Sequence, residues 1–272
     1  MNTLGKRLCV LMILLTGVYL RATAVQLPPP PPDSSQENLV HTLLAQANNV
    51  ALNQFDSRRA LALYSEALSL NGGNAEILWR ISRAYVDIGE QLPAETDEEQ
   101  ETQLSMYEKA LEFAEKSTAI DPENSMALTH RAIARARVTL YKGLWESVGL
   151  MNRVREDLGY ALQLDSTNHL AHYALAATHM KVIEKPWIIR WPLGLGWGDR
   201  DDAITHFEKA ITLRWDVISY RIGCARAYVE EGEYESARAH LTLIPMLRPQ
   251  DRGDDGARKE AFATLDRIQD EE

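Results

Sequence analysis

The chain has 272 residues, 45% of them hydrophobic and 25% charged, which is an ordinary composition for a folded protein. This length suits one large domain or an array of repeats. The formal net charge of −10 at pH 7 argues against nucleic acid as a partner, because a phosphate backbone requires clustered lysine and arginine side chains.

The first 24 residues have the pattern of a secretory signal peptide. Lys6 and Arg7 precede an apolar stretch over residues 8–20, and residues 22–24 (Ala-Thr-Ala) supply the small-x-small pattern that signal peptidase cleaves. The apolar stretch is too short to cross the roughly 30 Å core of a bilayer as a helix. We therefore predict cleavage after residue 24 and a periplasmic or secreted protein, with an uncleaved N-terminal membrane anchor as the alternative.

Residues 25–37 form a proline-rich linker, in which residues 28–32 are all proline. An unbroken proline run forms a stiff polyproline II helix without internal hydrogen bonds. We interpret the run as a spacer that holds the folded domain, residues 38–272, away from the membrane or the export machinery. A ligand for a proline-reading domain is the alternative.

Residues 38–272 are predicted to form helix pairs, because their apolar residues recur at spacings of three and four and no segment shows strand-like alternation. The first pair has a weakly patterned helix at residues 41–53, followed by a helix that carries Ala60, Tyr64 and Ala67. Small residues such as Ala60 let two helices approach closely, and an aromatic residue such as Tyr64 fills the gap beside them.

An acidic insertion interrupts the second pair. Its first helix runs from Asn74 to Gly89, but the apolar positions of its second helix begin only at Ala110, after residues 91–103. We interpret the insertion as a surface loop, or as an extension of the second helix towards the N-terminus. Pro122 ends this pair.

The third pair starts at Leu128, and its second helix has apolar positions within residues 154–161. The fourth pair has Leu175 in its first helix and Phe207 in its second, and the connector between them spans residues 185–197. We predict that this connector tucks into the core of its own repeat. Peripheral membrane contact or anchoring of a partner is the alternative for its three tryptophans, Trp187, Trp191 and Trp197.

The fifth pair, residues 218–251, follows the 34-residue tetratricopeptide pattern most clearly. Its first helix carries Tyr228, Gly232 marks the turn, and Ala237 begins the apolar positions of the second helix. Residues 254–269 then form an amphipathic helix that covers the apolar face left by this pair. The sequence therefore predicts an all-α tetratricopeptide-type α-solenoid of about five helix pairs with a C-terminal capping helix.

Three stretches carry a family resemblance: residues 74–90 (NAEILWRISRAYVDIGE), 107–124 (YEKALEFAEKSTAIDPEN) and 249–268 (PQDRGDDGARKEAFATLDRI). Together they resemble the bacterial tetratricopeptide relatives of the regulator of microtubule dynamics proteins, over residues 45–270. The resemblance implies the fold. The eukaryotic relatives are implicated in microtubule association and in organelle tethering or lipid handling. A bacterial exported protein meets no microtubules, so none of this is transferred as function.

The sequence offers no catalytic motif, since it contains no GxSxG, no HExxH and no phosphate-binding loop. His169 and His172 share one helix face, but His179 lies about 10 Å from His172 along the helix axis, too far for all three to bind one ion. We therefore predict a protein that is not an enzyme, with no cofactor and no metal site. A hydrolase without a known motif is the third hypothesis.

The leading hypothesis is a non-catalytic protein-binding scaffold or adaptor in the cell envelope, which holds a protein or peptide on the concave surface lined by the first helices of the pairs. Arginine can bind a carboxylate through two parallel hydrogen bonds, and we favour Arg83 and Arg135 as contacts for an acidic partner. The alternative is a carrier of lipid or another amphiphile in an apolar groove. The candidate partner-binding residues are Arg80, Arg83, Arg131, Arg135 and His172.

Overall fold

The computed structural model describes residues 34–271, and the predicted signal peptide and the proline run lie outside the described residues. Within this range the chain contains twelve α-helices, one 3-10 helix and no strand, which confirms the all-α prediction. No helix in the described part of the chain is both long and apolar enough to span a bilayer.

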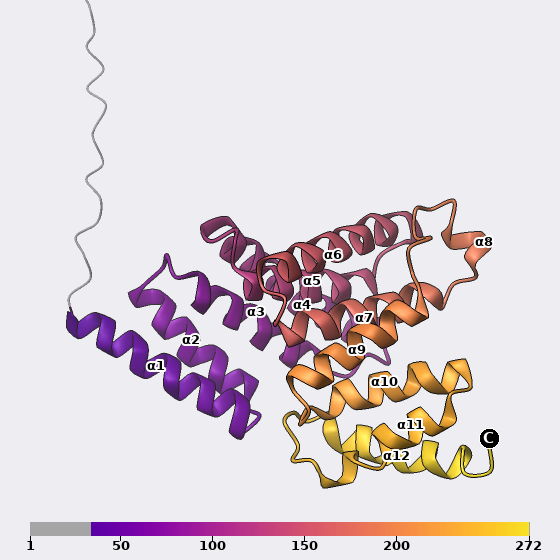
Figure 1. Ribbon diagram of the computed structural model, residues 1–272. Coiled ribbons are helices and arrows are strands. Elements are labelled where there is room, and N and C mark those ends of the chain that lie inside the picture. The colour runs from indigo at the N-terminus through magenta and orange to yellow at the C-terminus, as the bar shows by residue number, and fades with distance from the viewer. Residues whose placement is uncertain (1–33, 272) are drawn as a thin grey trace, which may run out of the picture. The chain divides into compact units, whose positions relative to one another are not determined.

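Ten of the helices form five consecutive pairs, followed by a capping helix (Figure 1). The number of pairs and the capping helix agree with the prediction. The first helix begins at Ser34 rather than at residue 41, so the end of the predicted linker, residues 25–37, is helical. The pairs are α1 (Ser34–Asn53) with α2 (Ser57–Leu70), α3 (Ala75–Glu90) with α4 (Asp97–Ile120), α5 (Ser125–Thr139) with α6 (Leu144–Leu164), α7 (His169–Ile183) with α9 (Arg200–Leu213), and α10 (Ile218–Glu231) with α11 (Tyr234–Leu241); η1 (Ile244–Met246) and the cap α12 (Asp254–Arg267) follow.

An asparagine starts the first helix of three consecutive pairs. The side-chain oxygens of Asn74, Asn124 and Asn168 accept hydrogen bonds at 3.1, 3.1 and 3.0 Å from the backbone N–H three residues further along. Each bond satisfies one of the N–H groups that a helix start leaves without an intrahelical acceptor. The sequence therefore fixes where α3, α5 and α7 begin, and with it the register of the side chains that they present.

The acidic insertion extends α4 instead of forming a loop, which is the second of the two interpretations given above. α4 begins at Asp97, and Thr96 and Glu99 form a reciprocal capping box at its start. Three carboxylates lie in its first turn, where they interact favourably with the helix dipole. Gln103 donates a hydrogen bond to the carbonyl of Gly89 at 2.7 Å, which ties the extension to the end of α3.

Two glycines mark places where an aromatic ring presses against a neighbouring helix: Tyr107 of α4 on α3 within the second pair, and Phe207 of α9 on α10 between the fourth and fifth pairs. A Cβ at Gly89 would lie 2.5 Å from the Tyr107 ring, and one at Gly223 would lie 2.8 Å from the Phe207 ring. Such distances are far below van der Waals contact, so these positions need glycine for packing rather than for backbone conformation. The pairs are thus held together by rings that fit against bare backbone.

The connector between α7 and α9 divides the three tryptophans. The short helix α8 (Trp187–Arg190) projects from the array (Figure 1) and leaves Trp187 and Trp191 66% and 69% exposed. Trp197 is half-buried, because its indole N–H donates to Asn152 Oδ1 at 2.8 Å and the His179 ring packs edge-on against it. The expectation of a buried connector is therefore wrong for Trp187 and Trp191 and correct in part for Trp197.

Candidate binding groove

The first helices of four consecutive pairs, α3, α5, α7 and α10, line a cavity of 580 Å³. Its lining mixes apolar side chains such as Ile133 and Leu140 with charged ones such as Arg83 and Asp87. We call this cavity the groove. It lies on the face that a tetratricopeptide array forms from its first helices, where such arrays present an extended binding surface.

The two ends of the array meet beside the groove. The guanidinium Nε of Arg252, in the segment before α12, donates a hydrogen bond at 2.9 Å to the carbonyl of Phe55, in the turn between α1 and α2. Leu52 from the end of α1 and Asp251 from the segment before α12 also line the cavity. Figure 1 shows these two segments next to each other. The groove is therefore bounded by residues from both ends of the repeat array.

A flat aromatic pair lies in the groove lining. The rings of Trp79 on α3 and His130 on α5 stack at a centroid distance of 4.9 Å with 3° between their planes. The Arg80 guanidinium covers Trp79 at 4.4 Å from the ring centroid. Burial, with Arg83 and Arg80 adding to it, lowers the pKa of His130 to about 3. His130 is therefore neutral, and its Nε2 has no hydrogen-bond partner within residues 34–271.

Carboxylates gather next to this pair. Asp87 lies one turn after Arg83 on α3, and the Arg83 Nε and an Asp87 carboxylate oxygen are 3.6 Å apart. Glu90 pairs with Arg137 of α5. The pKa of Asp87 is raised to about 6, mainly by burial; Arg83 opposes this rise, and Glu90 and Asp251 add to it. A third of the Asp87 side chain is open to the groove, so this carboxylate can change its charge near neutral pH while facing a ligand.

Tyrosines line the groove on the α7 and α10 side. The Tyr173 ring stacks on the Tyr220 ring at 4.7 Å, and His169 Nδ1 and the Tyr220 hydroxyl are 2.6 Å apart. Arg214 binds both carboxylate oxygens of Asp216, at 2.9 and 3.1 Å. The contacts of Tyr220 with Tyr173 and His169 tie the lining of α7 to that of α10, and the Arg214–Asp216 pair lies in the turn between α9 and α10.

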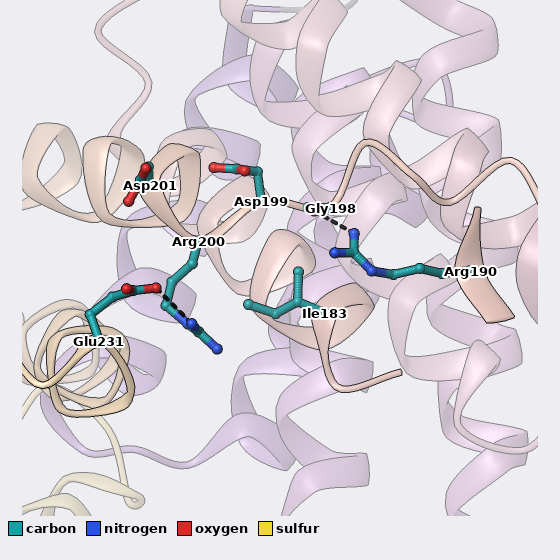
Figure 2. Close-up of a pocket in the computed structure, with 7 residues that line it drawn as sticks. All are labelled: Ile183, Arg190, Gly198, Asp199, Arg200, Asp201 and Glu231. Atoms are coloured by element: carbon teal, nitrogen blue, oxygen red, sulfur yellow. Dashed lines mark hydrogen bonds and ion pairs between the residues drawn. The ribbon is translucent and has the colours of Figure 1, made fainter. Parts of the chain in front are cut away.

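A second, smaller hollow of 330 Å³ lies among the end of α7, the connector and the start of α9 (Figure 2). Its two guanidiniums already bind groups of this chain. Arg200 pairs with Glu231 at 2.6 Å, and Arg190 donates to the carbonyl of Gly198. In the groove, by contrast, His130 Nε2 has no hydrogen-bond partner among the described residues, and the ion pair of Asp87 with Arg83 is long at 3.6 Å. The groove is therefore the stronger candidate site.

Comparison with known proteins agrees with the fold. The family model "Regulator of microtubule dynamics protein 1-3" matches residues 43–269. The chain belongs to this family. It is 25% identical over 238 residues to regulator of microtubule dynamics protein 3 of Bos taurus, and the match covers 82% of this chain but 48% of that relative. The chain thus spans about half the length of the curated relative that it matches.

Solved structures show the same architecture. A thermophilic tetratricopeptide protein of Thermus thermophilus superposes with a TM-score of 0.62 at 16% identity, over 82% of this chain and 99% of that one. PilF of Pseudomonas aeruginosa gives a TM-score of 0.52 at 14% identity, over 86% of this chain and 93% of that one. At these identities the likeness concerns the fold alone, and it confirms the tetratricopeptide prediction.

Of the five arginine and histidine side chains predicted to bind a partner, Arg83 lies in the groove lining. Arg80, one residue from Trp79, covers the Trp79 ring and binds Glu76 at 2.6 Å and Asn48 at 2.9 Å. Its contact with the groove is therefore indirect, through the Trp79 ring, which belongs to the lining. Whether either side chain contacts a partner stays a prediction.

Arg131 and Arg135 bind one carboxylate, that of Asp157 on α6. Arg131 reaches both of its oxygens, at 3.0 and 2.6 Å, and Arg135 reaches one at 2.5 Å. The Asp157 side chain is only 7% exposed. Neither arginine is among the described residues that line the groove. The structure gives both a role in holding α5 against α6, and their binding of a partner stays a prediction.

His172 also lies outside the groove lining. Its Nδ1 is 2.8 Å from His206 Nδ1 on α9, and its Nε2 is 3.1 Å from the carbonyl of Ser166. The structure therefore places His172 in a contact between the two helices of the fourth pair. A partner contact by His172 stays a prediction.

Sequence reasoning missed Trp79, His130 and Asp87. Two of them carried a signal, because Trp79, Arg83 and Asp87 recur every four residues and so share one face of α3. His130 carried none that points to Trp79, because the stacking of the two rings depends on how α5 is rotated against α3.

Proposed function

We propose that this protein is a non-catalytic scaffold that binds a segment of a partner protein in the groove. The tetratricopeptide fold supports the general role of a protein-interaction scaffold. The observation that carries the specific proposal is the stacked pair of Trp79 and His130 beside the Arg83 guanidinium. The two rings are themselves buried, so the groove offers the half-exposed Arg83 guanidinium beside apolar side chains such as Ile133 and Leu140. This combination suits a segment that offers an apolar side chain and a carboxylate within a few residues.

His130 calls for a hydrogen-bonding group in the bound segment. A neutral imidazole nitrogen donates or accepts one hydrogen bond, depending on the tautomer. Since Nε2 of His130 is buried and has no partner in the described chain, a ligand group that reaches it removes the cost of an unsatisfied buried polar atom. A backbone N–H or carbonyl of a bound segment supplies either role.

Asp87 makes binding depend on pH. A partner carboxylate that reaches Arg83 comes close to Asp87, and Glu90 and Asp251 already hinder ionisation of Asp87. Protonation of Asp87 removes this repulsion. Because its pKa is raised to about 6, we expect an acidic segment to bind more tightly at pH 5 than at pH 8.

A carrier of lipid or another amphiphile is the second candidate. The observation in its favour is the apolar part of the lining, which includes Met126, Leu140, Met151 and Leu170. Charged and apolar side chains share the groove, so an occupant with an apolar body and an anionic group fits its chemistry as well as a peptide does.

For location, we propose export to the periplasm or the medium, supported by the N-terminal sequence pattern. The intact mass of the native protein tests this, because a chain that retains residues 1–20 contradicts cleavage after residue 24. Peripheral contact with a membrane is proposed for Trp187 and Trp191, which are exposed together with Ile188 on α8. The proposal does not include Trp197, because its indole N–H donates a hydrogen bond to Asn152.

Site-specific photo-crosslinking in the native cell tests the groove. A benzophenone side chain at Leu140, which lines the groove and is 53% exposed, should capture one protein. The same group at Ser65, exposed on α2, is the matched control and should not. Arg83→Glu should abolish the Leu140 adduct while the circular dichroism spectrum stays unchanged.

Two results would decide against peptide binding. An adduct that is the same from Leu140 and Ser65, or that persists in Arg83→Glu, places the contact elsewhere. An adduct at Leu140 whose mass is that of a lipid replaces the scaffold by the amphiphile carrier.

A further inference from the structure

Three side chains with metal-binding atoms meet at the C-terminal end of the array. They come from three consecutive helices: Glu208 from α9, Cys224 from α10 and His240 from α11. The Cys224 Sγ lies 3.8 Å from Glu208 Oε1 and 3.8 Å from His240 Nε2, and His240 Nε2 lies 3.0 Å from Glu208 Oε1. The three atoms form a small triangle.

We propose that Glu208, Cys224 and His240 bind a divalent transition-metal ion, with zinc as the best fit. Zinc takes sulfur at about 2.3 Å and nitrogen or oxygen at about 2.0–2.2 Å in a tetrahedral arrangement, which sets the S···N and S···O edges at about 3.6 Å and the N···O edge at about 3.4 Å. The observed edges of 3.8, 3.8 and 3.0 Å differ from these by a few tenths of an ångström. Small side-chain shifts therefore bring all three atoms to bonding distance.

The donor set decides the class of metal. A thiolate and an imidazole favour zinc and disfavour magnesium or calcium, which prefer oxygen. Three protein ligands leave a fourth position, and the Glu208 side chain is 41% exposed, so water can reach the site and fill it. The charges balance as well, because a thiolate and a carboxylate neutralise a dication.

The surroundings support this geometry. The Tyr228 hydroxyl donates to the same Glu208 oxygen at 2.9 Å, so Oε1 is the convergence point of three side chains and is held in place by a hydrogen bond from outside the ligand set. The thiol of Cys224 is buried; burial and the Glu208 carboxylate raise its pKa, while the Arg221 guanidinium lowers it. Metal binding displaces the thiol proton to solvent, and the sulfur then donates its electron pair to the ion.

A bound ion would join α9, α10 and α11, and so fasten the last repeat to the fourth pair. The sequence analysis predicted no metal site, and the proposal departs from that prediction. The three residues are equally spaced in the chain, sixteen apart, and lie on the consecutive helices α9, α10 and α11. Their juxtaposition depends on how those helices are rotated, which spacing does not give.

Metal binding to the full-length protein tests the proposal directly. After removal of loosely bound metal, native mass spectrometry should find one zinc ion per chain, and zinc should raise the melting temperature. Cobalt(II) should give the charge-transfer absorption of a thiolate ligand. Cys224→Ser and His240→Gln should each lose the ion, and Tyr228→Phe should bind it about tenfold more weakly, because Tyr228 orients a ligand.

His206→Gln is the matched control, because His206 lies on α9, pairs with His172 at 2.8 Å and is not part of the triangle. It should keep the ion. Retention of zinc in Cys224→Ser, or loss in His206→Gln with retention in the other variants, overturns the proposal. Should Cys224→Ser fail to fold, the cobalt(II) spectrum of the unchanged protein decides, and a spectrum without thiolate absorption overturns the proposal.

Discussion

Asp87 and Asp157 show how one type of side chain serves two purposes in the same array. Asp157 is 7% exposed and is bound by two arginines from the neighbouring helix, at 2.5–2.6 Å. Asp87 is 33% exposed, and its arginine, on its own helix, lies 3.6 Å away. A carboxylate that reaches across two helices locks them together. Asp87, in contrast, pairs with Arg83 along a single helix, and both side chains line the groove. Their charges are only partly neutralised, so a ligand can interact with either of them.

Loss of Asp157 should have the largest effect. Asp157→Ala leaves the half-buried Arg131 and Arg135 without their shared anion, and we expect the free energy of unfolding to fall by about 3 kcal/mol. Urea unfolding followed by circular dichroism measures this. Glu115→Gln is the control, because this exposed side chain lies 3.4 Å from Arg135 and should contribute less than about 0.5 kcal/mol. Equal effects of both changes would contradict the structural role of Asp157.

Charge reversal at Arg83 and at Arg135, the two arginines favoured from the sequence, should lower stability by different amounts. Arg135→Glu places a carboxylate beside Asp157, and we expect a loss of about 3 kcal/mol. Arg83→Glu should cost less than about 1 kcal/mol, since its ion pair is long and open to solvent. Partner capture should be lost in Arg83→Glu. If Arg135→Glu unfolds at the same urea concentration as the unchanged protein, Arg135 is not part of the lock between α5 and α6.

Asp87→Asn should stabilise the fold at neutral pH. The pKa of Asp87 is about 6 in the folded protein against 3.8 as a reference, so the folded state binds this proton more tightly than the unfolded chain. Protonation of Asp87 therefore stabilises the folded protein at low pH, and this stabilisation is lost as the pH rises from about 4 to 6. After allowance for solvent, Asn should add about 1 kcal/mol at pH 7. Urea midpoints measured from pH 4 to 8 should change less steeply in the variant, and an unchanged slope would contradict the raised pKa.

The smallest effect is expected where the ends of the array meet. Arg252→Ala removes one exposed hydrogen bond to Phe55 and should lower stability by about 0.5 kcal/mol. Hydrogen exchange should nevertheless become faster at residues 52–56. Unchanged exchange there would show that other contacts hold the two ends of the groove together.

Most of the fold could be predicted from the sequence. The helix pairs follow from apolar spacing, and the asparagines at positions 74, 124 and 168 start their helices through bonds that span three residues. The insertion was harder, since an acidic stretch suits both a loop and a helix start. The Thr96–Glu99 capping box decides for the helix, and its sequence pattern was available. The exposure of Trp187 and Trp191 was not predictable, because an apolar connector can pack inward or project.

The site was predicted only in outline. That the first helices line a groove follows from the repeat, and Arg83 lies there. Arg131 and Arg135 occupy first helices as well, yet their anion comes from α6. Likewise, the sequence positions of His130, Cys224 and His240 do not predict which side chains of other helices they contact.

The sequence by itself determined the five pairs, the capping helix and the asparagine-capped starts of α3, α5 and α7, because capping, turn formation and amphipathic periodicity act over a few residues. Only the tertiary structure decided which charges face the groove, that Trp79 stacks on His130, and that Glu208, Cys224 and His240 meet. Each of these depends on the rotation of one helix against another. That rotation is set by the packing of many buried side chains at once, such as Tyr107 against Gly89 and Phe207 against Gly223, and no short stretch of sequence contains it.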